Sequence, residues 1–142
     1  MDKASRVISG TWGEMWLDDV YVGECYGLQA KIAFNRETIN QCRKLTPGKK
    51  LMSMEGTGSI KLHKVGSRMI EALKDVKDGT DPRFTIISKL DDPDAYGSER
   101  VMLTGVAFDD LTLADWEVGV TGKVESPFTF EDWELVDSIR EG

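Results

Sequence analysis

The chain has 142 residues, which is enough for one domain with a single hydrophobic core. Its 18 basic and 25 acidic residues give a net charge of -7, which argues against a nucleic-acid-binding protein, because such proteins cluster lysine and arginine against phosphates. No apolar run approaches the ~20 residues of a transmembrane helix, and the first residues lead into no signal-peptide core, so we expect synthesis in the cytoplasm and no membrane anchor.

The first elements in chain order are β-strands. The sequence Leu17-Asp18-Asp19-Val20 predicts a tight hairpin between strands at residues 14–17 and 20–24. Apolar side chains alternate with polar ones through residues 28–34, and again at residues 60–62. Because successive side chains of a strand point to opposite faces, these runs predict strands with one apolar face.

The alternation weakens across residues 36–56. The run of residues 37–52 has little apolar face to bury, and Pro47-Gly48 indicates a turn near its middle. Loops of this length are uncommon in compact domains unless they have a function. We therefore predict a long exposed hairpin or flap at about residues 36–56, which we call the arm.

Charge is distributed unevenly along the chain. Residues 36–64 hold seven basic residues against two acidic ones, whereas residues 109–142 hold ten acidic residues against two basic ones. Opposite patches on one protomer suit head-to-tail contacts between copies, which build rings or filaments. A mobile solvated loop beside an acidic surface is the alternative interpretation.

One segment has helical periodicity. Apolar residues recur at helical spacing through residues 65–77, with charged residues on the opposite face. Gly79 suits the C-cap of this helix, and a helix cannot continue through Pro82. We predict one amphipathic helix at about residues 65–77, packed through Val65, Met69, Leu73 and Val76.

The C-terminal half returns to the strand pattern, with a polar hairpin loop at residues 91–97. The strands that we predict here lie at residues 84–90, from Val101 and Leu103 onward, at residues 116–121 and at residues 127–135. Within residues 111–118, and again between Phe130 and Trp133, the apolar residues switch between odd-numbered and even-numbered positions. A bulge is the simplest cause of such a switch. Repeated bulges suit a strongly curled sheet, so the predicted fold is mostly β, a small β-barrel or sandwich with one helix.

No group of residues predicts catalysis. His63 is the only histidine, and it lies on the polar phase of a strand without zinc ligands nearby. Gly56-Thr57-Gly58 lacks the third glycine and the following helix of a dinucleotide loop, so we expect these glycines to begin a strand. We predict that the protein is not an enzyme and has no cofactor.

Two further groups are weighed as ligand sites. Asp91, Asp92 and Asp94 lack the spacing, central glycine and closing glutamate of an EF-hand, which indicates a solvated turn. Cys25 and Cys42 form no metal-binding pair, and disulfides are unusual in the cytosol. We therefore predict no metal site and two reduced thiols.

Several motifs together carry a family resemblance. They are Gly56-Thr57-Gly58-Ser59 before a strand, Asp81-Pro82-Arg83-Phe84-Thr85 leading to Leu90-Asp91-Asp92, Glu99-Arg100-Val101-Met102-Leu103, and Pro127-Phe128-Thr129-Phe130-Glu131-Asp132-Trp133. In this order and spacing they resemble the tail tube proteins of PBSX-type defective prophages, of related contractile phage tails and of phage-tail-like bacteriocins. The likeness covers nearly the whole chain, which implies a single tail tube domain at residues 1–142.

The resemblance implies a small β-barrel or sandwich with one helix, similar to the tube protein of type VI secretion. It implies that six copies form a ring around a channel, and that rings stack into a tube, inside a contractile sheath, that is driven through the target envelope. The expected partners are further copies of the chain, a sheath protein, baseplate or tube initiator and tail terminator proteins, and a tape measure protein or passing DNA in the lumen. The expected location is a virion or phage-tail-like particle, after synthesis in the host cytoplasm.

The resemblance also gives the arm a role as an inter-ring contact that becomes ordered on docking. The residues that we assign to this contact are Ile39, Arg43, Lys44, Leu45, Pro47, Gly48, Lys49, Lys50, Leu51 and Met52. The net negative charge suits a lumen that must not bind passing DNA, because like charges repel.

A binding module is the alternative from a different functional class. A small β-barrel could bind a ligand or a single-stranded nucleic acid through stacked aromatic side chains. The candidates for stacking are Trp12, Trp16, Tyr21, Tyr26 and Trp116. The negative charge argues against the nucleic-acid version of this hypothesis.

Overall fold

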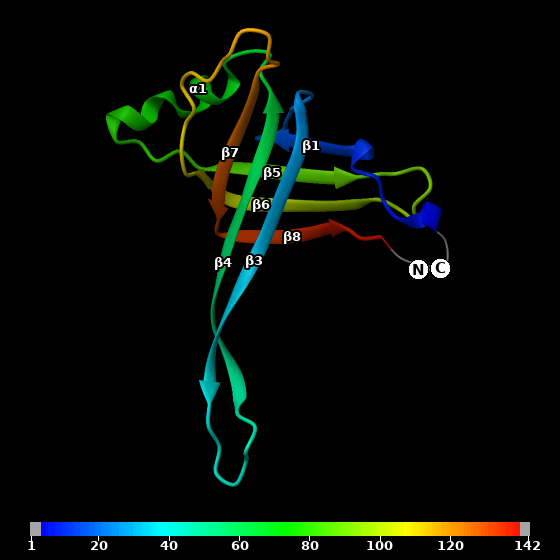
Figure 1. Cartoon of the computed structure of the whole chain (residues 1–142), viewed down its shortest axis with the longest axis vertical. Helices are drawn as coiled ribbons and strands as arrows, with labels where there is room; N and C mark the ends of the chain where they lie inside the picture. Colours follow the sequence, from blue (N-terminus) through cyan, green and yellow to red (C-terminus); the bar gives the residue numbers. More distant parts are fainter. Residues whose placement is uncertain (1–3, 140–142) are drawn as a thin grey trace.

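Eight antiparallel strands and one short α-helix form residues 4–139, the part of the chain that the computed structural model describes (Figure 1). The strands are β1 (Gly13–Leu17), β2 (Val20–Tyr21), β3 (Cys25–Ile39), β4 (Gly48–His63), β5 (Phe84–Leu90), β6 (Glu99–Phe108), β7 (Lys123–Phe130) and β8 (Asp132–Asp137). The helices are α1 (Arg68–Leu73) and three 3-10 segments, η1 (Ala4–Arg6), η2 (Gly10–Trp12) and η3 (Lys74–Asp78). The predicted mostly-β class with one α-helix is confirmed.

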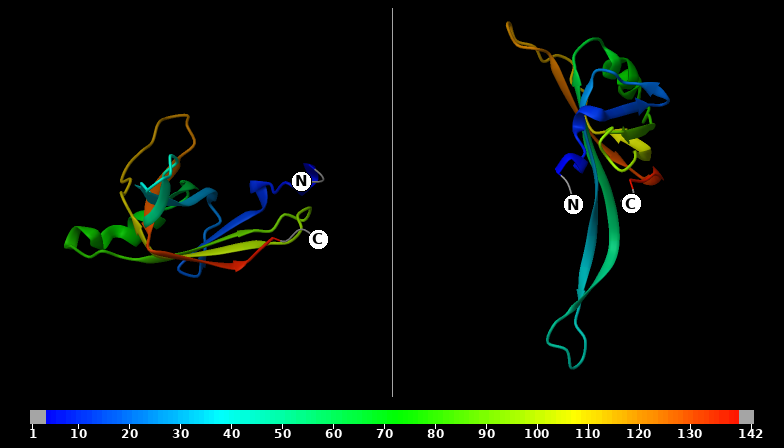
Figure 2. Two further views of the ribbon diagram at one scale, coloured as in Figure 1. Left: turned by 90° about the horizontal axis from the view of Figure 1, so that it is seen from below. Right: turned by 90° about the vertical axis from the view of Figure 1, so that its right-hand side faces the viewer.

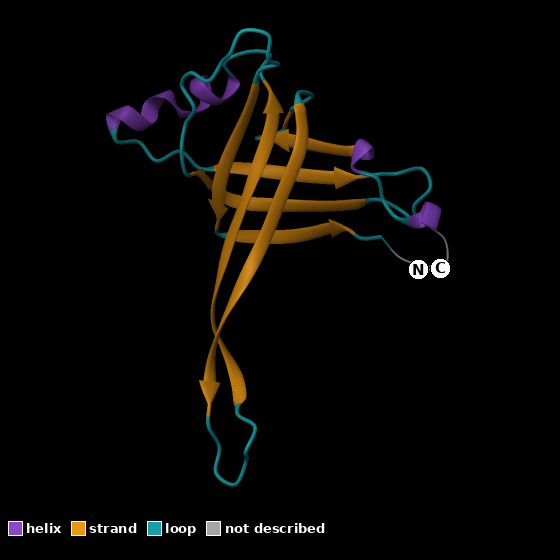
Figure 3. Ribbon diagram, viewed as in Figure 1, coloured by secondary structure: helices purple, strands orange, loops and turns teal. Residues whose placement is uncertain are grey.

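The strands form two groups that cross each other (Figure 3). The sheet order is β2-β1-β5-β6-β7-β4-β3, with β8 paired to β6 outside this path. Strand β6 belongs to both groups, because one part of it pairs with β5 and β8 while Ala107 and Phe108 pair with β7. Strands that change sheets at a bend are typical of orthogonal packing. Along this path β2 and β3 stand at opposite ends, so the described chain is an open sandwich.

The core lies between the two crossing groups. Its most deeply buried side chains are Ile60 of β4, Ile86 of β5, Val106 of β6 and Phe128 of β7. Burying a side chain of this size contributes about 1.5–3 kcal/mol. The alternation predicted at residues 60–62 is therefore real, since Ile60 and Leu62 enter the core and Lys61 does not.

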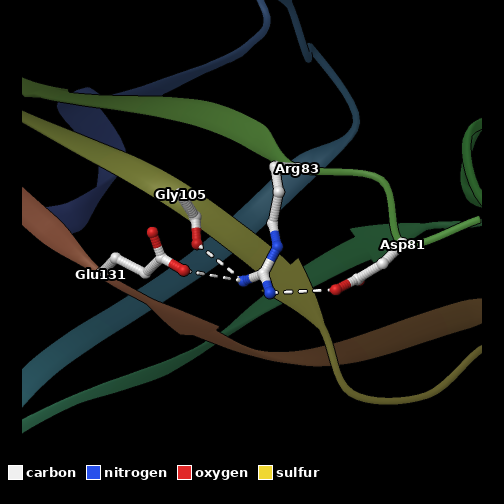
Figure 4. A network of polar contacts seen from close by, with 4 residues as sticks. All are labelled: Asp81, Arg83, Gly105 and Glu131. Carbon is white, nitrogen blue, oxygen red and sulfur yellow. Dashed lines mark hydrogen bonds and ion pairs between the residues drawn. The ribbon is translucent and has the colours of Figure 1, made fainter.

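Two corners let the chain pass between the groups. Gly105 in β6 has φ +64, and Glu131 separates β7 from β8. Arg83 connects these corners: Nη1 donates to the Gly105 carbonyl at 3.4 Å and lies 3.5 Å from Glu131, while Nη2 lies 2.9 Å from Asp81 (Figure 4). The phase change between Phe130 and Trp133 thus arises from a corner, whereas we expected a bulge.

Gly56 and Gly58 lie inside β4, so the prediction that these glycines begin a strand was wrong. A Cβ at Gly56 would lie 2.6 Å from the ring of Phe130. A Cβ at Gly58 would lie 2.2 Å from the Gln29 carbonyl oxygen and 2.6 Å from the ring of Phe128. The glycines leave room for two core aromatic rings against the backbone of β4, a requirement that the sequence does not display.

The helix is shorter than predicted. Helix α1 begins at Arg68, and of the predicted stripe only Met69 and Leu73 are buried, while Val65 and Val76 are exposed. The backbone tightens to 3-10 geometry after Leu73, which turns Val76 away from the core. The predicted C-cap is confirmed, because Gly79 has φ +86 and its N–H bonds to the Val76 carbonyl. Within residues 4–139 no helix is long and apolar enough to cross a membrane.

No strand forms at residues 116–121, so that prediction was also wrong. Residues 109–122 form a loop that connects the end of β6 at Phe108 to the start of β7 at Lys123. The alternating apolar side chains in this loop have no neighbouring strand and stay exposed.

Asp92 also differs from the expected solvated turn, because it is buried. Its carboxylate accepts hydrogen bonds from the backbone N–H groups of Ser9 (2.9 Å) and Asp94 (2.9 Å). These two bonds lower the pKa of Asp92. The aspartate therefore connects the N-terminal segment to the loop between β5 and β6.

An ion pair attaches α1 to the start of β3. Arg68 Nε lies 2.5 Å from Glu24 Oε1, and this hydrogen bond lowers the pKa of Glu24. A lowered carboxyl pKa stabilises the fold above the unfolded value, about 4.3, and this stability is lost as the pH falls through the folded pKa. We expect Glu24→Gln to cost about 1 kcal/mol at pH 7, with a difference from the wild type that shrinks below pH ~4.3. Urea melts across pH measure this difference.

The matched control for this prediction is Glu71→Gln. Glu71 pairs with Lys74 at 3.2 Å, but both side chains are largely exposed, so its removal should change stability little at any pH. A Glu24→Gln cost that does not depend on pH would assign the effect to packing and not to charge.

Candidate assembly surfaces

The predicted arm at residues 36–56 lies in a long hairpin formed by β3 and β4. The two strands pair from Cys25 opposite Leu62 to Ile39 opposite Gly48, and residues 40–47 form the tip. The hairpin extends well past the crossing groups and past β8 (Figure 1). None of residues 36–55 is buried, so the projecting part takes no part in the core.

All ten predicted contact residues lie on the exposed end of this hairpin. Ile39 ends β3; Arg43, Lys44, Leu45 and Pro47 lie in the tip; Gly48, Lys49, Lys50, Leu51 and Met52 open β4. Each is exposed, and Leu45 is fully so. The hairpin brings them together at one pole of the molecule.

A bulge determines which residues share a face of the arm. Asn35 pairs with Ser53, but the next residue, Arg36, pairs with Leu51, so Met52 is the extra residue of β4. The bulge reverses the faces of β4 between Met52 and the tip. Beyond the bulge the odd-numbered residues of β4 point to the face that continues from the core. Leu51, opposite Arg36, therefore lies on that face.

The two faces of the arm differ in chemistry. Phe34 and Met54 lie opposite each other on the face that continues from the core, yet they are 57% and 58% exposed. The Arg36 guanidinium lies 5.8 Å from the centre of the Phe34 ring on the same face. The other face carries Glu37 opposite Lys50 and, closer to the tip, the exposed Ile39 opposite Gly48. The arm therefore presents one apolar and basic surface.

A groove of about 470 Å³ lies where the arm leaves the body. Ile32, Met54 and Gly56 line one side, and Phe130 and Trp133 line the other. Trp133 pairs with the buried Leu103 across β8 and β6 but is itself half exposed. Apolar surface thus continues from the core, through the groove, onto the arm.

The acidic C-terminal region is not one patch. The loop of residues 109–122 carries one group of acidic residues, and it lies at the pole opposite the arm tip (Figures 1 and 2). Strand β8 and residue Glu131 carry a second group, near the base of the arm. Glu141 and Arg140, counted in the sequence pattern, lie outside the described residues. The acidic residues of this region therefore lie on separate surfaces, and Glu125 of β7 lies apart from both groups.

The other candidate groups are spread over the molecule. Among residues 4–139 no three His, Cys, Asp or Glu side chains are placed to hold a metal ion. The His63 ring stacks on Tyr26 with centroids 4.5 Å apart. Both cysteines are free, and burial raises the pKa of Cys25.

The aromatic side chains proposed for stacking do not form one platform. Tyr21 and Tyr26 line a groove of about 540 Å³. Trp16 contacts Tyr21 with ring centroids 5.5 Å apart, whereas Trp116 lies in the exposed loop between β6 and β7. The structure therefore does not gather these rings along a single nucleic-acid groove.

Comparison with known proteins identifies relatives over the full length. Residues 2–137 match the family model described as phage tail tube protein. The phage-like element PBSX protein XkdM of Bacillus subtilis (strain 168) is 33% identical over 142 residues, covering 98% of this chain and 97% of its own. The uncharacterized protein YqbM of the same organism is 33% identical over 141 residues, covering 97% and 96%.

Solved structures share the fold at low sequence identity. A chain of the sheath-tube complex of the extracellular contractile injection system PVC matches with a TM-score of 0.73 and 7% identity, over 95% of this chain and 98% of its own. A chain of the anti-feeding prophage cap matches with a TM-score of 0.74 and 10% identity, over 92% and 91%. These similarities show that the chain shares its overall fold with these proteins.

Proposed function

Because this chain belongs to the phage tail tube protein family, we propose that six copies form a ring and that rings stack head to tail into the hollow inner tube of a contractile tail. The particle is a phage tail or a phage-tail-like particle, in which the tube is driven through the target envelope. The observation that carries this proposal is the pair of open edges on the group β3-β4-β7.

The open edges lie on opposite sides of this group of strands. Among the described residues, β3 pairs with β4 and its other edge carries no strand. Strand β7 pairs with β4 along its whole length, but with β6 only at Thr129 and Phe128. Open edges expose unpaired N–H and C=O groups and invite pairing. Pairing the β3 edge of one copy with the β7 edge of the next is a heterologous contact, and such a contact forms a ring when the rotation between copies closes.

The outer face of the same three strands suits the wall of a channel. Lys61 of β4 lies opposite Glu125 of β7, and Thr57 lies opposite Thr129. Together with Lys31 and Glu55 these side chains give a polar face with opposite charges near balance. The acidic excess of the chain lies elsewhere, so repulsion of DNA by a strongly acidic lumen is not part of the proposal.

The proposed partners follow from the tube. A contractile tail requires a sheath around the tube, a baseplate or initiator at one end and a terminator at the other, with a tape measure protein or DNA passing inside. Chains similar to this one occur in a sheath-tube complex, a sheath/tube terminator and a baseplate of contractile injection systems. We expect the corresponding partners for this chain, in a virion or phage-tail-like particle assembled in the host cytoplasm.

Negative-stain electron microscopy of the purified chain over a concentration series tests the proposal. Rings and tubes with a central channel are the expected result. A chain that stays monomeric at high concentration, and still does so with its sheath and baseplate partners present, would overturn it.

The arm supplies the contact between rings in this proposal. Reversing two of its charges, with Lys44→Glu and Lys49→Glu, should slow stacking about tenfold at low salt, because exposed charges steer association. At ~1 M salt the difference should nearly vanish, since the Debye length falls to about 3 Å. Light scattering during assembly measures both rates. Unchanged rates at low salt would exclude an electrostatic arm contact.

A further inference from the structure

The loop of residues 109–122 is the most exposed apolar surface outside the arm. Trp116 is 81% exposed and Val118 is 90% exposed, and Leu113 and Val120 are exposed beside them. The loop connects β6 to β7 and pairs with no strand. Large apolar side chains gathered on an exposed segment and flanked by polar residues mark a protein contact.

The charge of the loop indicates which protein surface it fits. The loop carries Asp109, Asp110, Asp115 and Glu117 and contains no basic residue. The ion pairs of residues 4–139 include none of these four carboxylates. A surface that is both apolar and acidic is complementary to one that is apolar and basic.

The arm is that complementary surface. From residue 36 to residue 52 it carries five basic residues against one acidic residue, Glu37. Its exposed apolar side chains include Leu45, Leu51 and Met52. None of these five basic side chains forms an ion pair within residues 4–139. Each surface thus has unpaired charges that the other could neutralise.

The two surfaces cannot meet within one copy. The tip of the arm and the loop between β6 and β7 lie at opposite ends of the longest axis of the molecule, as the views in Figures 1 and 2 agree. Copies translated along this axis in the same orientation bring the arm of one toward the loop of the next. Such a head-to-tail contact repeats without limit along the axis.

We propose that the loop of residues 109–122 is the docking surface for the arm of a copy in the adjacent ring. This inference rests on the proposed tube function, which names the arm but not its partner surface. The acidic residues of β8, the other half of the acidic region, are not part of the contact.

A charge exchange tests the pairing. Asp115→Lys with Glu117→Lys should slow stacking about tenfold at low salt, as the arm reversal Lys44→Glu with Lys49→Glu does. Combining the loop and arm pairs in one chain restores attraction and should recover most of the rate. The matched control is Glu134→Lys with Asp137→Lys on β8, which should not rescue the arm reversal.

The possible outcomes distinguish a failure of the tube function from a failure of the proposed contact between arm and loop. Wild-type protein that forms neither rings nor tubes, even with its sheath and baseplate partners present, would overturn the tube function and this inference with it. Wild-type tubes together with loop variants that stack normally, or rescue by the β8 control, would overturn the inference alone. Trp116→Ala gives a charge-independent check and should also reduce stacking, whereas Trp12→Ala, at a half-exposed tryptophan in η2, should not.

Discussion

Gly58→Ala is expected to destabilise the fold by about 3 kcal/mol, at the upper end of the usual cost of overpacking. The new methyl group would lie 2.2 Å from the Gln29 carbonyl oxygen, a backbone atom that cannot move without disturbing the pairing of β3 with β4. It would also press on Phe128, which is completely buried. For a chain of this size such a loss lowers the melting temperature by roughly 10 °C, which thermal denaturation followed by circular dichroism measures.

Two other glycines calibrate this effect. At Gly56 the three atoms nearest to the added methyl group all belong to the ring of Phe130 and none to the backbone, so Gly56→Ala should cost less than Gly58→Ala. At Gly66 no atom lies within 4 Å of the added group, and Gly66→Ala should change stability by no more than about 1 kcal/mol. Equal melting temperatures for all three variants would show that β4 does not need its glycines for the approach of the two rings.

Deleting residues 41–50 is expected to abolish stacking while leaving a folded domain. All ten residues are exposed, so no core surface is lost. Arg36 still pairs with Leu51, and residues 37–40 become a four-residue connection, a length that β-hairpins commonly use. The variant should melt cooperatively near the wild-type temperature and form isolated rings. Thermal denaturation and electron microscopy measure these two properties.

A variant of unchanged length separates the reach of the arm from its chemistry. Replacing residues 41–47 with glycine and serine keeps the length of the tip but removes Arg43, Lys44 and Leu45. We expect this variant also to stack poorly, because the proposed contact depends on those side chains. Normal tubes from the deletion variant would refute the arm contact, and non-cooperative melting would show that the arm belongs to the folding unit.

The sequence predicts elements well where local pattern and burial agree. The hairpin at residues 17–20 forms as expected, with Asp18 and Asp19 at positive φ and Trp16 opposite Tyr21. Gly79 caps the helical segment because its backbone is in the left-handed conformation, which glycine adopts readily. In both cases neighbouring residues alone determine the conformation.

Prediction from the sequence fails where contacts with distant segments determine the local conformation or burial. Residues 116–121 alternate like a strand, but no strand lies beside them, so alternation alone gives a loop. The need for a glycine at position 58 comes from Phe128, seventy positions later, and the burial of Asp92 comes with its hydrogen bond from Ser9, 83 positions earlier. Acidic residues close together in sequence fall on two surfaces because the corner at Glu131 turns β8 away from β7.

The opposite placement of the arm and the loop of residues 109–122 has a consequence for the ends of a finished assembly. A stack of identically oriented copies exposes unfilled loops at one end and unfilled arms at the other. One end is then acidic and the other basic, so a single capping protein cannot serve both. In the proposed tube, growth therefore has a direction, and the protein that starts the tube must differ chemically from the protein that ends it.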